Sequence, residues 1–109
     1  MSTADADLAD RIRVLLAAEE STREVRMFGG VSFMVNESMV VAARPDGDLL
    51  VRIAPERSGE LTAQPGAEPA EMGSGRSMGP GWISVAREAI ADDRRLSSWL
   101  EAALDHNAR

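Results

Sequence analysis

Apolar residues recur at helical spacing near both ends of the chain. Within residues 5–20, the recurring positions are Leu8, Ile12, Leu15 and Leu16. After residue 92, they are Leu96, Trp99, Leu100, Ala103 and Leu104. Residues three, four, seven and eight positions apart lie on one face of an α-helix. We therefore predict a helix with one apolar face near each end, and Asp92 as the N-cap of the second.

The middle of the chain has the short apolar runs and turn signals that are typical of β-strands. We predict strands over residues 25–35, 39–43 and 49–53, with turns at Asn36-Glu37-Ser38 and Pro45-Asp46-Gly47-Asp48. The second turn signal is strong because proline fixes φ and glycine accepts a positive φ. Strands joined by such short turns form an antiparallel meander.

The remaining elements complete an α+β pattern. Pro55 opens a short helix that ends before Gln64, and residues 67–72 form a short edge strand, since Pro69 cannot donate to a ladder. A loop over residues 73–81 leads to a last strand over residues 82–85. We predict a two-layer α+β fold in which helices pack on an antiparallel sheet, as a single domain over residues 1–109.

Two glycines, Gly29 and Gly30, interrupt the first predicted strand. They could place backbone amides around a phosphate, or they could serve the backbone itself. Glycine inside a strand usually marks a bulge or a close approach of another backbone. We favour the structural interpretation, in which the glycines let Phe28 and Phe33 reach the core.

Composition excludes several classes of chemistry. The chain has 109 residues and no cysteine, which rules out disulfides, thiolate zinc sites and thiol nucleophiles. The N-terminal stretch is acidic and lacks the apolar region of a signal peptide. The aliphatic-type run at residues 39–43, which no run in the chain exceeds, is far shorter than the roughly 20 residues that cross a bilayer. We expect a soluble cytoplasmic protein that does not associate with membranes.

The charge distribution argues against nucleic acid as a ligand. The net charge is −6, and the 12 basic residues are all arginine and scattered among acidic neighbours. Nucleic-acid-binding proteins usually gather their basic residues on one face. We therefore expect no strong nucleic-acid binding.

No set of residues has the pattern of a catalytic or cofactor site. His106 is the fourth residue from the end, where we expect a fraying, solvated helix turn rather than a fixed general base. The glycine-rich residues 73–79 do not match a phosphate-binding spacing, and a strand rather than a helix follows them. The functional alternative for this loop is a mobile partner-binding segment that carries Arg76 and Met78. We expect no catalytic residues, no cofactor and no metal ion, although carboxylates alone leave a Mg²⁺ site open.

Four blocks of the chain resemble the TfoX N-terminal domain family (TfoX/Sxy). They are RMFGGVSFMVN, DGDLLVRI, PGAEPAEMGSGRSMGPGWISV and a terminal helix with an acidic start and a Leu-x-x-Trp pattern. The resemblance implies the order α-β(3)-α-β(2)-α, similar to secretion chaperones. It also implies a link to the regulation of natural competence, and it supplies no catalytic residues.

Together these observations favour a non-enzymatic regulatory or adaptor domain that binds a protein partner, with a link to transcriptional or competence-type regulation. The alternative is a small-ligand-binding domain or an enzyme of unknown chemistry. The candidate partner-binding residues are Arg26, Phe28, Gly29, Gly30, Met72, Arg76, Met78 and Trp82. We also expect a homodimer, because a short sheet leaves edges to be covered.

Overall fold

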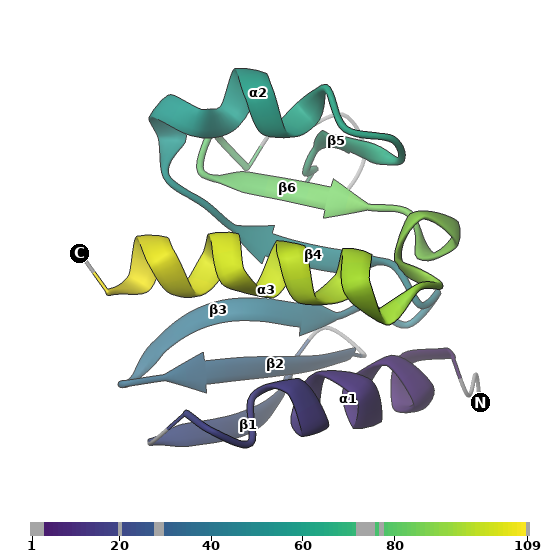
Figure 1. The fold of residues 1–109 in the computed structure, drawn as a ribbon, viewed down its shortest axis with the longest axis vertical. Helices are drawn as coiled ribbons and strands as arrows, with labels where there is room; N and C mark the ends of the chain where they lie inside the picture. Colours follow the sequence, from purple (N-terminus) through teal and green to yellow (C-terminus); the bar gives the residue numbers. More distant parts are fainter. Residues whose placement is uncertain (1–3, 20, 28–29, 72–75, 77, 109) are drawn as a thin grey trace.

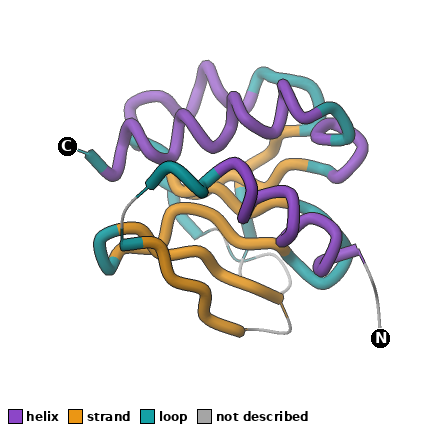
Figure 2. The backbone as a smooth tube through the Cα atoms, turned by 60° about the horizontal axis from the view of Figure 1, so that its bottom comes forward, coloured by secondary structure: helices purple, strands orange, loops and turns teal. Residues whose placement is uncertain are grey.

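The computed structural model describes residues 4–19, 21–27, 30–71, 76 and 78–108. These residues form two layers, with the helices on one face of an antiparallel sheet (Figures 1 and 2). The helices are α1 (Ala4–Leu15), α2 (Ser58–Thr62) and α3 (Asp93–Asn107), with 3₁₀ turns η1 (Pro55–Arg57) and η2 (Arg87–Ile90). The strands are β1 (Thr22–Met27), β2 (Gly30–Val35), β3 (Ser38–Ala43), β4 (Leu49–Arg52), β5 (Ala67–Pro69) and β6 (Trp82–Val85). Their order in the sheet is β1-β2-β3-β4-β6-β5, which confirms the predicted α+β class.

The predicted first strand, residues 25–35, is wrong in one respect. It is two antiparallel strands, and the register places Met27 opposite Gly30. The described sheet therefore has six strands, one more than the expected order contains. The stretch Thr22–Arg26 is too charged to suggest a buried strand, but an edge strand needs little apolar surface. Two strand-like runs separated by a glycine-containing pair are a hairpin signal, and the pairing of Met27 with Gly30 shows that Gly30 begins a second strand rather than continuing the first.

Both predicted turns are present. Asn36 and Glu37 have φ values of 53° and 67°, so they reverse the chain between β2 and β3 in the left-handed region. Gly47 has a φ of 91° in the next turn, where the Asp46 Oδ1 atom accepts a hydrogen bond of 2.9 Å from the Asp48 N–H. These turns set the register of the meander.

The core lies between the helices and the facing side of the sheet. Its largest fully buried side chains include Phe33, Ile12, Leu16, Leu49, Ile83 and Leu96. The apolar faces predicted for α1 and α3 thus pack on the sheet, and Trp99 is buried among them. Met34 and Met39 are half-buried. Phe28 lies outside the described residues, as does the Met27 side chain.

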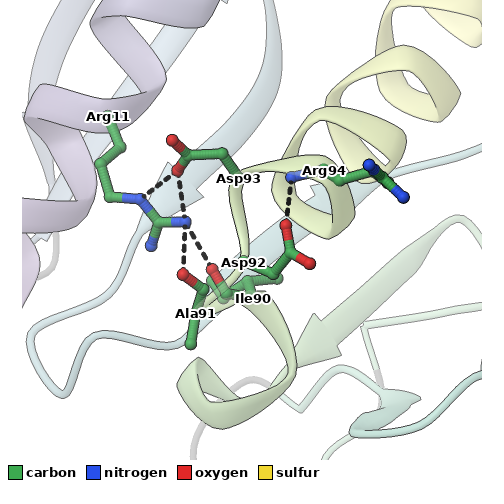
Figure 3. A network of polar contacts seen from close by, with 6 residues as sticks. All are labelled: Arg11, Ile90, Ala91, Asp92, Asp93 and Arg94. Carbon is green, nitrogen blue, oxygen red and sulfur yellow. Dashed lines mark hydrogen bonds and ion pairs between the residues drawn. The ribbon is translucent and has the colours of Figure 1, made fainter.

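One arginine joins α1 to the start of α3 (Figure 3). The Arg11 Nη2 atom donates to the Ile90 carbonyl at 2.6 Å, and its Nε atom donates to the Asp93 Oδ1 atom at 2.9 Å. Beside it, the predicted N-cap is confirmed, because the Asp92 Oδ1 atom accepts a hydrogen bond of 2.7 Å from the Arg94 N–H. Arg11 therefore fixes the position of α1 relative to the α3 N-terminus.

Across the described ranges, no helix combines the length and the apolarity needed to cross a membrane.

Candidate functional site

The described residues among those predicted to bind a partner lie in two separate places. Phe28, Gly29 and Met72 lie outside the described residues. Arg26 lies on the edge strand β1, and Gly30 begins the neighbouring strand β2. Trp82 lies on β6, and β2, β3 and β4 separate it from β1. The fold therefore places the described candidates Arg26 and Trp82 in two distant parts of the sheet.

Two of the candidates near β6, Met78 and Trp82, are connected through the main chain of Ala70. The Met78 N–H donates to the Ala70 carbonyl at 2.9 Å, and the Ala70 N–H donates to the Trp82 carbonyl at 3.2 Å. Trp82 and Met78 are half-buried, whereas Arg76 is exposed. Since Ile83 is in the core and side chains alternate along a strand, Trp82 faces the side of the sheet that carries no helix.

A groove of about 250 Å³ lies between α2 and α3. Its apolar residues are Leu61, Trp99 and Ala102, and its polar ones are Arg57, Gln64, Ser98, Glu101 and Asp105. Leu61 and Trp99 are each 4% exposed, so they belong to the core as well as to the groove. Among the described residues, none of the candidate partner-binding residues lines it.

The polar residues of this groove come from two segments that are far apart in the sequence. Ser98, Glu101 and Asp105 occupy the exposed face of α3, three and four positions apart, next to the buried Trp99. Arg57 comes from η1, and its Nε atom contacts the Glu60 Oε1 atom at 2.9 Å. Helical spacing in the sequence predicts the α3 face. It gives no sign that α2 lies opposite.

A smaller groove of about 150 Å³ lies between α1 and the hairpin of β1 and β2, and Arg26 lines it. Here Arg13 binds Glu24 with two parallel hydrogen bonds, Nε to Oε2 at 2.6 Å and Nη2 to Oε1 at 2.7 Å. Asp10 accepts a further bond from Arg13. The Arg13 guanidinium lowers the pKa of Glu24, and the Glu24 and Asp10 carboxylates raise the pKa of Arg13. Arg26 makes no ion pair within the described residues.

His106 is not in the solvated position that we expected. It is half-buried, and its Nδ1 atom is buried with no hydrogen-bond partner in the described part of the chain. The last turn of α3 is joined to β2, because the Asn107 side chain donates to the Val35 carbonyl at 3.0 Å. Across the described ranges, no three histidine, aspartate or glutamate residues gather where they could hold a metal ion.

The model of the TfoX N-terminal domain family matches residues 14–107. The chain belongs to this family. As a TfoX N-terminal domain, it has both walls of the α2–α3 groove inside the matched span, whereas part of the α1 wall of the smaller groove lies before it.

The fold of this TfoX N-terminal domain is similar to the crystal structure of a protein from Pseudomonas syringae. The TM-score is 0.59, and the alignment covers 86% of this chain and 93% of that chain at 16% identity. Because the identity is so low, the likeness concerns the fold alone. No curated protein matches this chain.

Proposed function

We propose that this TfoX N-terminal domain is a non-enzymatic regulatory or adaptor domain that binds a protein partner in transcriptional or competence-type regulation. The observation that carries the proposal is the α2–α3 groove, in which the buried Trp99 and Leu61 underlie charged residues of both signs. Protein interfaces combine an apolar centre with a polar rim in this way.

The size of the groove favours part of a protein over a small molecule as its occupant. Pockets that enclose small ligands usually measure about 300–1,000 Å³. The groove, at about 250 Å³, is smaller. It suits one or two side chains presented by a partner surface, which rests on the surrounding faces of α2 and α3.

The charges indicate what kind of surface would fit. Glu101 lies on one wall, and Arg57 on the other contacts Glu60. The whole chain has a net charge of −6. A partner with an apolar side chain flanked by arginine or lysine complements this groove, and opposite charges also speed association.

Affinity capture from the native cytosol tests the proposal. The parent chain is compared with Glu101→Arg and Ser98→Arg, which alter the groove, and with Glu19→Arg, which makes the same charge change as Glu101→Arg in an exposed segment after α1. We expect the groove variants to retain about tenfold less of one protein, a loss of about 1.4 kcal/mol, while Glu19→Arg retains it fully. A transcriptional regulator as the captured protein supports the regulatory part.

Two outcomes contradict the proposal. Equal capture by all four chains removes the groove as the binding site. A thermal shift of the parent with a metabolite, lost in Glu101→Arg and with no protein captured, supports instead the alternative of a small-ligand-binding domain or enzyme.

A further inference from the structure

The outer side of β1 is an unpaired sheet edge within the described residues. β1 comes first in the strand order and pairs only with β2 (Figure 1). The Ser21 carbonyl accepts a hydrogen bond of 3.3 Å from the Asn36 N–H, so the main chain of residue 21 points toward the neighbouring strand. Because these directions alternate in an antiparallel pair, the main-chain N–H and C=O groups of Arg23 and Val25 also point toward β2. The main-chain groups of Thr22, Glu24 and Arg26 therefore point outward.

The side chains of β1 divide between the two faces of the sheet. Glu24 lies opposite Phe33 and Arg26 opposite Val31, both of which are core residues, so the two charged side chains lie on the helix-bearing face. Val25 lies opposite Ser32 and points to the other face. The outer edge thus presents a carboxylate and a guanidinium two residues apart on one face, with a half-buried valine between them on the other.

Two copies of this strand can pair antiparallel about a two-fold axis only in registers that place the outward main-chain groups of one copy opposite those of the other. Because these groups belong to every second residue, the axis passes through a residue, which within β1 is the interior residue 23, 24, 25 or 26. Registers centred on 23 and 26 place an arginine opposite the same arginine, and the register centred on 24 places Glu24 opposite Glu24. Like charges directly opposite each other destabilise a strand pair. The register centred on Val25 instead places Glu24 of each copy opposite Arg26 of the other.

We propose that two copies of this chain pair antiparallel through β1, with Val25 on the two-fold axis, so that their sheets become continuous. Four main-chain hydrogen bonds form between Glu24 and Arg26 of the two copies, and two cross-strand ion pairs accompany them. Arg26, which has no ion pair within the described residues, gains one. Glu24 stays in place through its two bonds to Arg13. The occupant of this edge is a second copy, because the charge pattern of the strand is complementary to itself.

A single introduced cysteine tests the register, since the chain contains none. In the proposed register, the two Val25 residues form a non-hydrogen-bonded pair with Cα atoms about 4.5 Å apart, within disulfide range. We expect Val25→Cys to form a disulfide-linked dimer in a mild oxidising buffer. Arg23→Cys is the matched control on the same strand and face, and its two sulfurs lie about 13 Å apart along the strands. Equal cross-linking of both variants, or of neither, overturns the proposal.

Charge reversal tests the ion pairs in a chain without cysteine. Sedimentation over the micromolar range should show the parent as a dimer, and Arg26→Glu and Glu24→Arg should each dimerise about tenfold more weakly. An equimolar mixture of the two variants should recover the dimer, because every opposing pair then has opposite charges. This recovery separates an interface effect from the loss of the Arg13 contact in Glu24→Arg.

Arg94→Glu is the control for net charge. It makes the same charge change as Arg26→Glu but on α3, so it should leave the dimer intact. A parent chain that stays monomeric across the whole range overturns the proposal. So does a mixture that dimerises no better than its components.

Discussion

Gly30 lies against the main chain of Ala43. A β-carbon built on Gly30 would overlap the Ala43 carbonyl oxygen, and it would lie 3.2 Å from both the Ala43 carbonyl carbon and the Arg44 Cα. Glycine is therefore needed where β2 begins beside the end of β3. This contact confirms the expectation that a glycine of the pair lies against another backbone, while Gly29 is outside the described residues.

Replacing Gly30 with valine should destabilise the domain with no partner present. The new side chain forces β2 away from β3, and overpacking of this kind costs about 1–3 kcal/mol of the free energy of unfolding. A thermal melt of Gly30→Val measures the loss as a lower melting temperature. Gly59→Ala is the control, because nothing lies within 4 Å of its built β-carbon and alanine favours the α2 helix. If Gly30→Val melts like the parent, the structural interpretation of Gly30 fails, and this segment becomes the best candidate for a binding site.

Replacing Arg11 with methionine should separate α1 from the start of α3. The variant keeps the aliphatic stem but loses the bonds to Ile90 and Asp93, and hydrogen bonds from a charged group contribute about 1.5–3 kcal/mol. Chemical denaturation should show a lower free energy of unfolding. Asp93→Asn removes only the exposed ion pair and should cost less than about 1 kcal/mol. Equal losses of unfolding free energy in the two variants would mean that the 2.6 Å hydrogen bond from Arg11 to the Ile90 carbonyl adds nothing to stability.

The stability of the domain should depend on Glu24 in acid. Arg13 lowers the pKa of Glu24 in the folded chain below the ordinary carboxyl value of 4.5. The stabilisation is therefore present above that value and is lost as the pH falls through the lower, folded pKa. Glu24→Gln should melt slightly below the parent at neutral pH, and the gap should close as the solution is acidified. Glu19→Gln, in an exposed segment, should follow the parent at every pH. A gap that stays constant down to the acid transition would falsify this assignment.

Binding to plain duplex DNA should be weak and sensitive to salt. The net charge of −6 opposes the neutralisation of phosphates, which supplies non-specific affinity. A fluorescence titration at low and physiological salt should show affinity only at low salt. Submicromolar binding at physiological salt would contradict the prediction and would reopen a nucleic-acid role.

The candidate sites were harder to predict than the fold, and β1 shows why. Its charged residues look unlike a strand in the sequence, yet β1 is an edge strand that pairs with β2 on one side. Met72, Arg76 and Met78 were chosen for their loop composition, and the α2–α3 groove was missed entirely. Its walls, residues 57–64 and 98–105, are each ordinary amphipathic segments with no signal of a shared site.

The sequence by itself determined the elements whose causes are local. Helical spacing placed the buried faces of α1 and α3, Asp92 marked the start of α3, and Gly47 marked a turn, because periodicity, capping and φ preferences act over a few neighbouring residues. Only the tertiary structure decided that residues 22–27 form an edge strand, that Gly30 needs its missing side chain beside Ala43, and that α2 faces α3. These relationships join residues far apart in the chain, and packing selects them from many alternatives that the local sequence permits equally well.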